Sequence, residues 1–84
     1  MDTDKTETAQ IPDPAITCNL TSLLADRKMT LSRLSEIVGI SIVNLSILKN
    51  GHARSVRYST LAAICLALDC EVGELLVVNR EAAR

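Results

Sequence analysis

The side chains that most often carry chemistry are few in this chain of 84 residues, and their spacing indicates no active site. Three cysteines, Cys18, Cys65 and Cys70, are accompanied by one histidine, His52. Their number is odd and no two form a C-x-x-C pair, so we expect neither a disulfide framework nor a zinc site, and interpret them as reduced, mostly buried apolar residues. Without a G-x-S-x-G serine or a glycine-rich phosphate loop, the sequence predicts no enzyme, no cofactor and no small-molecule ligand.

Basic side chains are concentrated in the middle of the chain. Residues 27–57 contain six Lys or Arg against one Glu, a local charge of +5, whereas residues 1–26 carry −4 and residues 58–84 carry −2. A basic segment between acidic ends suits a surface that faces phosphate, but the same pattern is typical of a solvated face. Tyr58 is the only aromatic residue, which argues against base stacking on single strands. Arg27 and Lys28 end the first predicted helix, and its dipole explains them.

Composition divides the chain into three parts. Residues 1–15 are polar, acidic and interrupted by two prolines, which predicts a flexible N-terminal arm. Residues 16–78 form the predicted domain, and residues 79–84 a short C-terminal tail. No apolar stretch approaches the ~20 residues that span a bilayer, and the polar start does not resemble a signal peptide. We therefore expect a cytoplasmic protein that does not interact with membranes.

Helical spacing of apolar residues begins after Asn19 and predicts an all-α domain of five short helices. Thr30 is the predicted N-cap of the second helix, Gly39 ends it, and Ser59 is the predicted N-cap of the fourth. The last helix is expected at residues 72–76. The residues expected to point inward from the first four helices are Leu20, Leu23 and Leu24, then Leu31, Leu34, Ile37 and Val38, then Leu45 and Leu48, then Leu61, Ile64, Cys65 and Leu68.

Two short apolar segments flank these helices. Residues 16–18 are predicted to form a short extended segment, and residues 77–78 are β-branched and follow the last predicted helix. We expect the two segments to pair as a small sheet within the chain or to meet across a two-fold axis between two copies.

The second and third predicted helices form the most informative unit. Only Ile40 and Ser41 separate Gly39 from the third helix, and Ser35 supplies a small residue where two steeply crossing helices would touch. The segments that carry the pattern are MTLSRLSEIVGISIVNLSILKNG (Met29–Gly51) and TLAAICLALDCEVGELL (Thr60–Leu76). They resemble the Cro/phage-repressor (XRE-like) family of helix-turn-helix regulators, particularly its short single-domain members, over residues 19–78.

That resemblance implies a compact five-helix fold whose third helix enters the major groove of double-stranded DNA, usually from a homodimer. The base-facing positions that it implies are Ser41, Ile42, Val43, Asn44, Ser46, Ile47 and Asn50. The positions that we assign to phosphate contacts, as a group at the edge of this unit, are Arg33, Lys49, His52, Arg54 and Arg57. The expected function is a sequence-specific DNA-binding transcriptional regulator, with repression favoured over activation.

The recognition face departs from the family pattern at three positions. Ile42, Val43 and Ile47 stand where relatives usually place side chains that form hydrogen bonds to base edges, and Leu31 replaces a common phosphate-anchoring Gln. Three explanations remain open: the aliphatic residues contact thymine methyl groups, they form a protein-contact surface, or the helix register is shifted by one and part of the face is core. The second explanation defines the alternative function, a protein-interaction module or antitoxin-like accessory protein.

Overall fold

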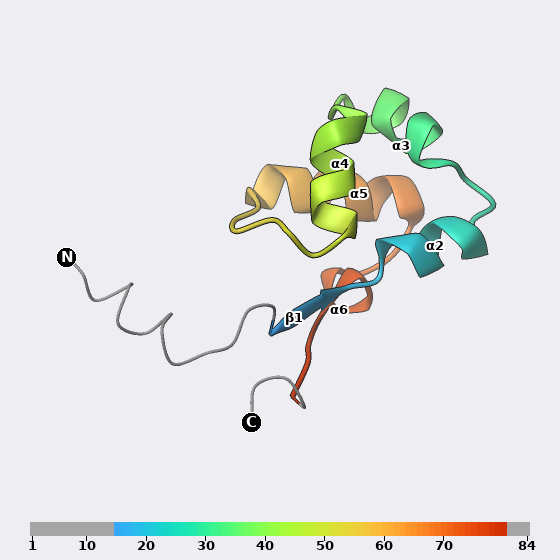
Figure 1. The fold of residues 1–84 in the computed structure, drawn as a ribbon. Coiled ribbons are helices and arrows are strands. Elements are labelled where there is room, and N and C mark those ends of the chain that lie inside the picture. The colour runs from blue at the N-terminus through green and yellow to red at the C-terminus, as the bar shows by residue number, and fades with distance from the viewer. Residues whose placement is uncertain (1–14, 81–84) are drawn as a thin grey trace.

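The computed structural model describes residues 15–80 and contains five helices and two short strands in that range. Their bounds are β1 (Ile16–Cys18), α2 (Leu20–Asp26), α3 (Leu31–Val38), α4 (Ile42–Lys49), α5 (Tyr58–Leu68), α6 (Val72–Leu75) and β2 (Leu76–Val78). The five-helix fold with a small terminal sheet is as expected (Figure 1). The predicted N-terminal arm and C-terminal tail lie outside the described residues, apart from residues 15, 79 and 80.

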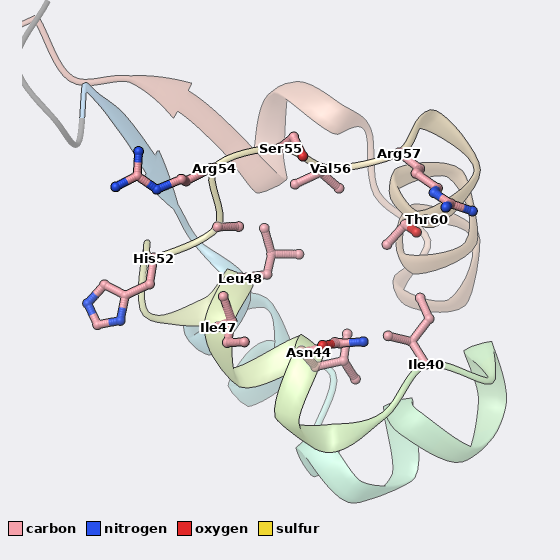
Figure 2. A pocket seen from close by; sticks show the side chains of 12 residues that line it. Ile40, Asn44, Ile47, Leu48, His52, Arg54, Ser55, Val56, Arg57 and Thr60 are labelled. Atoms are coloured by element: carbon pink, nitrogen blue, oxygen red, sulfur yellow. The ribbon is translucent and has the colours of Figure 1, made fainter.

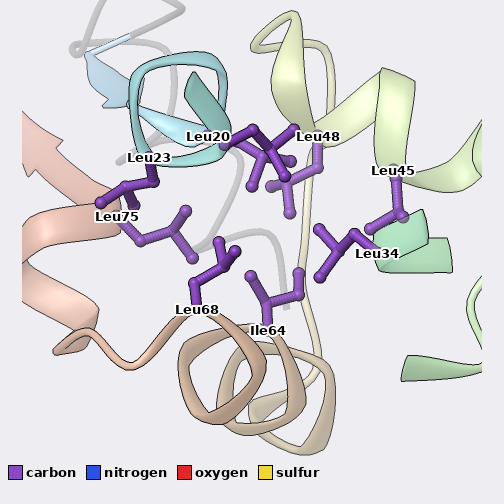
Figure 3. Packing of buried hydrophobic residues seen from close by; sticks show 9 residues of the cluster. Leu20, Leu23, Leu34, Leu45, Leu48, Ile64, Leu68 and Leu75 are labelled. Atoms are coloured by element: carbon purple, nitrogen blue, oxygen red, sulfur yellow. The ribbon is translucent and has the colours of Figure 1, made fainter. Parts of the chain in front are cut away.

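A single aliphatic core joins all five helices. Figure 3 shows side chains from α2, α4, α5 and α6 converging with Leu34 of α3 in the centre of the domain. The buried residues are Leu20, Leu23, Leu24, Leu34, Leu45, Leu48, Ile64, Leu68 and Leu75. Full burial of one such side chain contributes about 1.5–3 kcal/mol, so this cluster supplies the main driving force for folding.

One residue predicted to face the core does not do so. Ile37 is 46% exposed, whereas Leu34 is fully buried and Leu31 and Val38 are half-buried against the core. The residues at positions 31, 34 and 38 follow one helical stripe, and Ile37 lies about a quarter-turn to its side. The expected inward position of Ile37 was therefore wrong, because the stripe is narrower than the run of apolar residues.

Helix α3 has the predicted residues at both of its ends, and the structure adds an N-cap to α4. The Thr30 hydroxyl accepts a hydrogen bond from the backbone N–H of Arg33 (3.0 Å), and the Ser41 hydroxyl accepts one from Asn44 (3.1 Å). Gly39 follows α3 in the left-handed region (φ 73°), where a side chain would be strained.

The start of α5 and the end of α6 differ from prediction. The N-cap of α5 is Arg57 and not Ser59, because the Arg57 carbonyl already accepts the first helical bond, from Leu61 (3.1 Å). Helix α6 ends at Leu75, one residue earlier than expected, because Leu76 has joined β2.

The two strands form an antiparallel pair within the chain, with Ile16 opposite Val78 and Cys18 opposite Leu76. This confirms the first of the two expected arrangements. The backbone N–H of Asn19 donates to the Leu75 carbonyl (2.7 Å), while the Asn19 side chain donates to the Glu74 carbonyl (3.2 Å) and does not cap α2. The sheet thus connects the two ends of the domain.

Arg27 stabilises a helix other than its own. Its Nε donates to the Leu68 carbonyl (2.6 Å) and its Nη2 to the Asp69 carbonyl (3.1 Å), at the C-terminal end of α5. The last carbonyls of a helix lack intrahelical partners and carry partial negative charge, which a guanidinium satisfies. The sequence associated Arg27 with the end of α2, and only the packing of α2 beside α5 gives it this role.

No single helix within residues 15–80 is long and apolar enough to cross a membrane. Helices α3 and α4 reach that composition only when taken together, and the chain bends by 118° between them.

Candidate nucleic-acid interface

The bend between α3 and α4 is held by a hydrogen bond that closes the turn. The Ser35 hydroxyl, on α3, donates to the carbonyl oxygen of Ile40, in the turn, at 2.6 Å. Gly39 supplies the left-handed residue that reverses the chain, and its N–H donates to the Ser35 carbonyl (2.9 Å). Two short helices joined by a three-residue turn at this angle form a helix-turn-helix unit.

The outward face of α4 is largely apolar. Leu45 and Leu48 point into the core, and at about 100° per residue the opposite direction is occupied by Val43, Ile47 and Asn50. Val43 is 68% exposed and Ile47 is 41% exposed. Because the two buried leucines fix the rotation of α4, the register is not shifted, and the third explanation for the aliphatic face is wrong.

The remaining predicted base-facing residues lie on the flanks of α4. Ile42 is 45% exposed and lies on one flank, and Asn44 is exposed on the other. Ser46 is half-buried, and the Ser41 hydroxyl already accepts a backbone hydrogen bond. The exposed side-chain amide of Asn44 lies beside the apolar face.

A hollow of about 380 Å³ lies between α4, the loop of residues 50–57 and the start of α5. Figure 2 shows Asn44, Ile47 and Leu48 rising from α4 on one side, with Val56 of the loop opposite them. The residues that line the hollow are Ile40, Asn44, Leu45, Ile47, Leu48, His52, Ala53, Arg54, Ser55, Val56, Arg57 and Thr60. It has an apolar floor and a polar rim.

Three of the five predicted phosphate-contact residues lie on this rim. Arg57 lies at one end of the hollow, and His52 and Arg54 lie at the opposite end (Figure 2). All three side chains are exposed, and within residues 15–80 none of them forms an ion pair. The structure thus brings positive charge beside the outward face of α4.

The other two predicted phosphate-contact residues are placed differently. Lys49 is half-buried on the last turn of α4. Arg33 is exposed on α3 and pairs with Glu36 at 3.0 Å, one helical turn away. Its charge is therefore partly compensated, and it does not line the hollow.

The loop before α5 and the first turn of this helix carry polar groups that were not among the predicted site residues. Tyr58 is 88% exposed, and the Ser55 and Thr60 hydroxyls line the hollow. No side chain caps α5, so N–H groups of its first turn lack a side-chain acceptor. Arg57 and Thr60 are three residues apart, about one helical turn, and this spacing could have indicated that they lie on the same side of the start of α5. The predicted N-cap at Ser59 left Arg57 outside the helix, so the relation was missed.

Within residues 15–80, no three His, Cys, Asp or Glu side chains are grouped so that they could hold a metal ion.

The fold and this surface define a helix-turn-helix protein. Comparison with known families then specifies it: residues 19–81 match the Cro/C1-type HTH DNA-binding domain, and the chain belongs to this family. It is a DNA-binding regulator of a non-enzymatic class.

A curated relative supports this assignment. The chain is 56% identical over 62 residues, or 74% of each protein, to a protein of Bacillus subtilis (strain 168) named "uncharacterized HTH-type transcriptional regulator YozG". No solved structure matches the chain significantly. The resemblance stated from the sequence is thereby confirmed at the level of the family.

Proposed function

We propose that this protein is a sequence-specific transcriptional repressor that inserts α4 into the major groove of double-stranded DNA as a homodimer. The observation that carries the proposal is the combination of an outward α4 face with three exposed basic side chains beside it. Repression is favoured over activation because a protein bound at a promoter blocks polymerase without a further contact. We place this regulator in the cytoplasm, where it meets DNA.

Phosphate contacts would come from two sides of the hollow. Arg54 and Arg57 are exposed and form no ion pair within the described residues, and the uncapped start of α5 offers backbone N–H groups and the Tyr58 hydroxyl. Helix N-termini attract phosphate because their free N–H groups and the helix dipole both favour negative charge. His52 and Lys49 would add contacts near the C-terminal end of α4, on the side of Arg54, and Arg33 would add a weaker one.

Base contacts would come from a face that is mainly apolar. Val43 and Ile47 are suited to thymine methyl groups, whereas Asn44 and Asn50 offer amides for hydrogen bonds to base edges. Ser41 and Ser46 have less freedom because of the capping bond and partial burial, and Ile42 would contact the groove wall.

The experiment is fluorescence anisotropy of the full chain with labelled random duplex DNA at two salt concentrations. About four phosphate contacts per protomer, or about eight in the homodimer, predict that affinity falls by about four orders of magnitude between about 50 and about 200 mM salt. In a homodimer each substitution removes two contacts, so Arg54→Ala and Arg57→Ala should each reduce the slope of log affinity against log salt by about two. Arg80→Ala, an equal change of charge beyond β2, is the matched control. Absence of binding at low salt would refute the proposal.

The homodimer has its own support and its own test. Ile16, Val77 and Val78 are 46%, 39% and 51% exposed, so apolar surface remains open at the terminal sheet after the strands have paired. Sedimentation equilibrium at high micromolar concentration should give a mass of two chains. A one-chain mass would refute the dimer and leave DNA binding to be judged separately.

The exposure of Ile42, Val43 and Ile47 also favours the second candidate, a protein-interaction module. The two functions differ in their response to salt, because apolar contacts do not weaken as salt is added. Val43→Ala with Ile47→Ala would abolish binding of a protein partner, while Arg54→Ala would leave it unchanged.

A further inference from the structure

The C-terminal end of α5 brings two cysteines of different segments together. Cys65 lies in the last turns of α5, and Cys70 is the second residue after the helix. Asp69, between them, has left-handed backbone angles (φ 52°, ψ 56°), and the N–H of Cys70 donates to the carbonyl of Cys65 at 3.0 Å. This bond across the end of a helix defines a Schellman motif, in which the two closing side chains are frequently in contact.

The closing side chains in this protein are two thiols. Both side chains are half-buried against the core, and they occupy the two closing positions of this motif. Burial, together with the adjacent Cys65, raises the pKa of the Cys70 thiol to about 11. Cys18 lies on β1, opposite Leu76 in the sheet, and is not part of this pair.

The backbone bond limits how far apart the two residues can be. A hydrogen bond of 3.0 Å joins N of Cys70 to O of Cys65. Adding the distance from each atom to its own Cα gives a Cα–Cα separation of at most about 7 Å, and less for any bent path. Disulfides require Cα separations below about 7 Å with the side chains directed toward each other, and a Schellman motif brings its two closing side chains toward each other.

The turn is also held from outside the pair. Arg27 donates to the carbonyls of Leu68 and Asp69, so the backbone between the cysteines has a fixed conformation. A bond between the two sulfurs would therefore close a turn that already exists, without displacing a helix.

We propose that Cys65 and Cys70 form an oxidisable dithiol that a peroxide converts into an intramolecular disulfide. The thiolate of Cys65 attacks one oxygen of hydrogen peroxide, the O–O bond breaks, and Cys65 sulfenic acid and hydroxide are formed; the hydroxide becomes water by taking up the proton that the Cys65 thiol released. The Cys70 sulfur then attacks Sγ of Cys65, the S–O bond breaks, and hydroxide leaves as water with the proton of Cys70. Two thiols are oxidised by two electrons and one peroxide is reduced to two waters.

The environment of Cys70 assigns the order of these steps. A raised pKa keeps Cys70 largely protonated at neutral pH, and the thiolate is the reactive form. Cys70 is therefore the resolving thiol, and Cys65 is the thiol that is oxidised first. This site does not depend on the proposed binding of DNA.

The experiment treats the reduced full chain with hydrogen peroxide, then unfolds it and alkylates the free thiols. We expect the intact mass before alkylation to fall by about 2 Da, with one alkylation, at Cys18, instead of three. Protease cleavage before Asp69 places Cys65 and Cys70 on different peptides, and these should remain joined until a reductant is added. A disulfide that includes Cys18, a cross-link between chains, or three free thiols would overturn the proposal.

Two variants provide the controls. Cys18→Ser keeps the pair, and it should lose the same mass and accept no alkylation after oxidation. Cys70→Ser removes the resolving thiol, and it should retain a sulfenic acid at Cys65, a gain of about 16 Da that a sulfenic-specific trapping reagent captures. Loss of about 2 Da in Cys70→Ser would show that another pair is oxidised and would overturn the assignment.

Discussion

The hydroxyl of Ser35 donates a 2.6 Å hydrogen bond to the carbonyl oxygen of Ile40, across the turn that separates α3 from α4. The bond joins the end of one helix to the residue that positions the next. It also satisfies a partly buried carbonyl, which would otherwise lose its hydrogen bond to water without replacement. Because α4 carries the candidate recognition face, this bond connects the stability of the turn to the orientation of that face.

Removing the Ser35 hydroxyl should therefore cost stability. For Ser35→Ala we expect the free energy of unfolding to fall by about 1 kcal/mol, measured by urea denaturation. Ser35→Leu should cost about 1–3 kcal/mol, because extra volume forces the two helices apart. Ser32→Ala, at an exposed position of the same helix, is the control and should change stability little. Equal stability of Ser35→Ala and Ser32→Ala would contradict the role of the bond.

Substitutions at Gly39 and Gly73 distinguish the effect of backbone strain from the effect of steric contacts made by a new Cβ. A Cβ at either position would meet nothing within 4 Å, but only Gly39 has a positive φ, of 73°. Gly39→Ala should destabilise the protein by about 1–2 kcal/mol through backbone strain alone. Gly73→Ala, inside α6, should stabilise it by about 0.5–1 kcal/mol. Thermal unfolding should show shifts of opposite sign, and shifts of the same sign would refute this explanation.

The contribution of the hydrogen bonds from Arg27 to the stability of α5 can be measured with the neighbouring residue, Lys28, as the control. Arg27→Ala removes both hydrogen bonds to the end of α5, and we expect a loss of about 1–2 kcal/mol. Lys28→Ala removes an equal charge at an exposed adjacent position that forms no such bond, and should be nearly neutral. Hydrogen exchange should also become faster at the amides of the last turn of α5 in Arg27→Ala. Protection that is unchanged there would show that the cap does not stabilise this turn.

Ionisation of Cys70 should make stability depend on alkaline pH. The pKa of this thiol is raised from an ordinary value of 9.0 to about 11, so the unfolded chain loses the proton first as pH rises. The neutral thiol favours the fold, and this contribution is complete below about pH 9 and lost by about pH 11. Denaturation of reduced protein between these values should show a steeper loss of stability in the wild type than in Cys70→Ser. Identical slopes would contradict the raised pKa.

The proposed contacts between aliphatic side chains of α4 and thymine methyl groups can be tested by changing the DNA. Once a preferred duplex has been selected, replacing a contacted thymine by uracil removes one methyl group and should weaken binding by about 0.8 kcal/mol, a factor of about four. The same replacement should have no effect on Val43→Ala if Val43 makes that contact. If uracil is tolerated at every position, the aliphatic face does not read thymine methyl groups.

The elements of this fold were largely predictable from local patterns. Thr30 and Gly39 mark the ends of α3 by chemistry that acts within three or four residues, so their positions agreed with the structure. Ile37 and Ser59 were misassigned because apolar character alone does not define the width of a buried stripe, and because several residues near the start of α5 can cap a helix. The candidate site was predicted as a set of residues, without the hollow that brings part of it together.

By itself, the sequence determined the helix-turn-helix unit, the aliphatic composition of the core and the concentration of basic residues in the middle of the chain. These properties depend on residue type and on spacing over one or two helical turns. The tertiary structure decided which residues face solvent and which residues contact each other. It set the rotation of α4, the end of α5 that Arg27 caps, and the proximity of Cys65 to Cys70. Such relations depend on how separate helices pack and on the backbone angles at their ends, and a periodic pattern in one segment does not contain them.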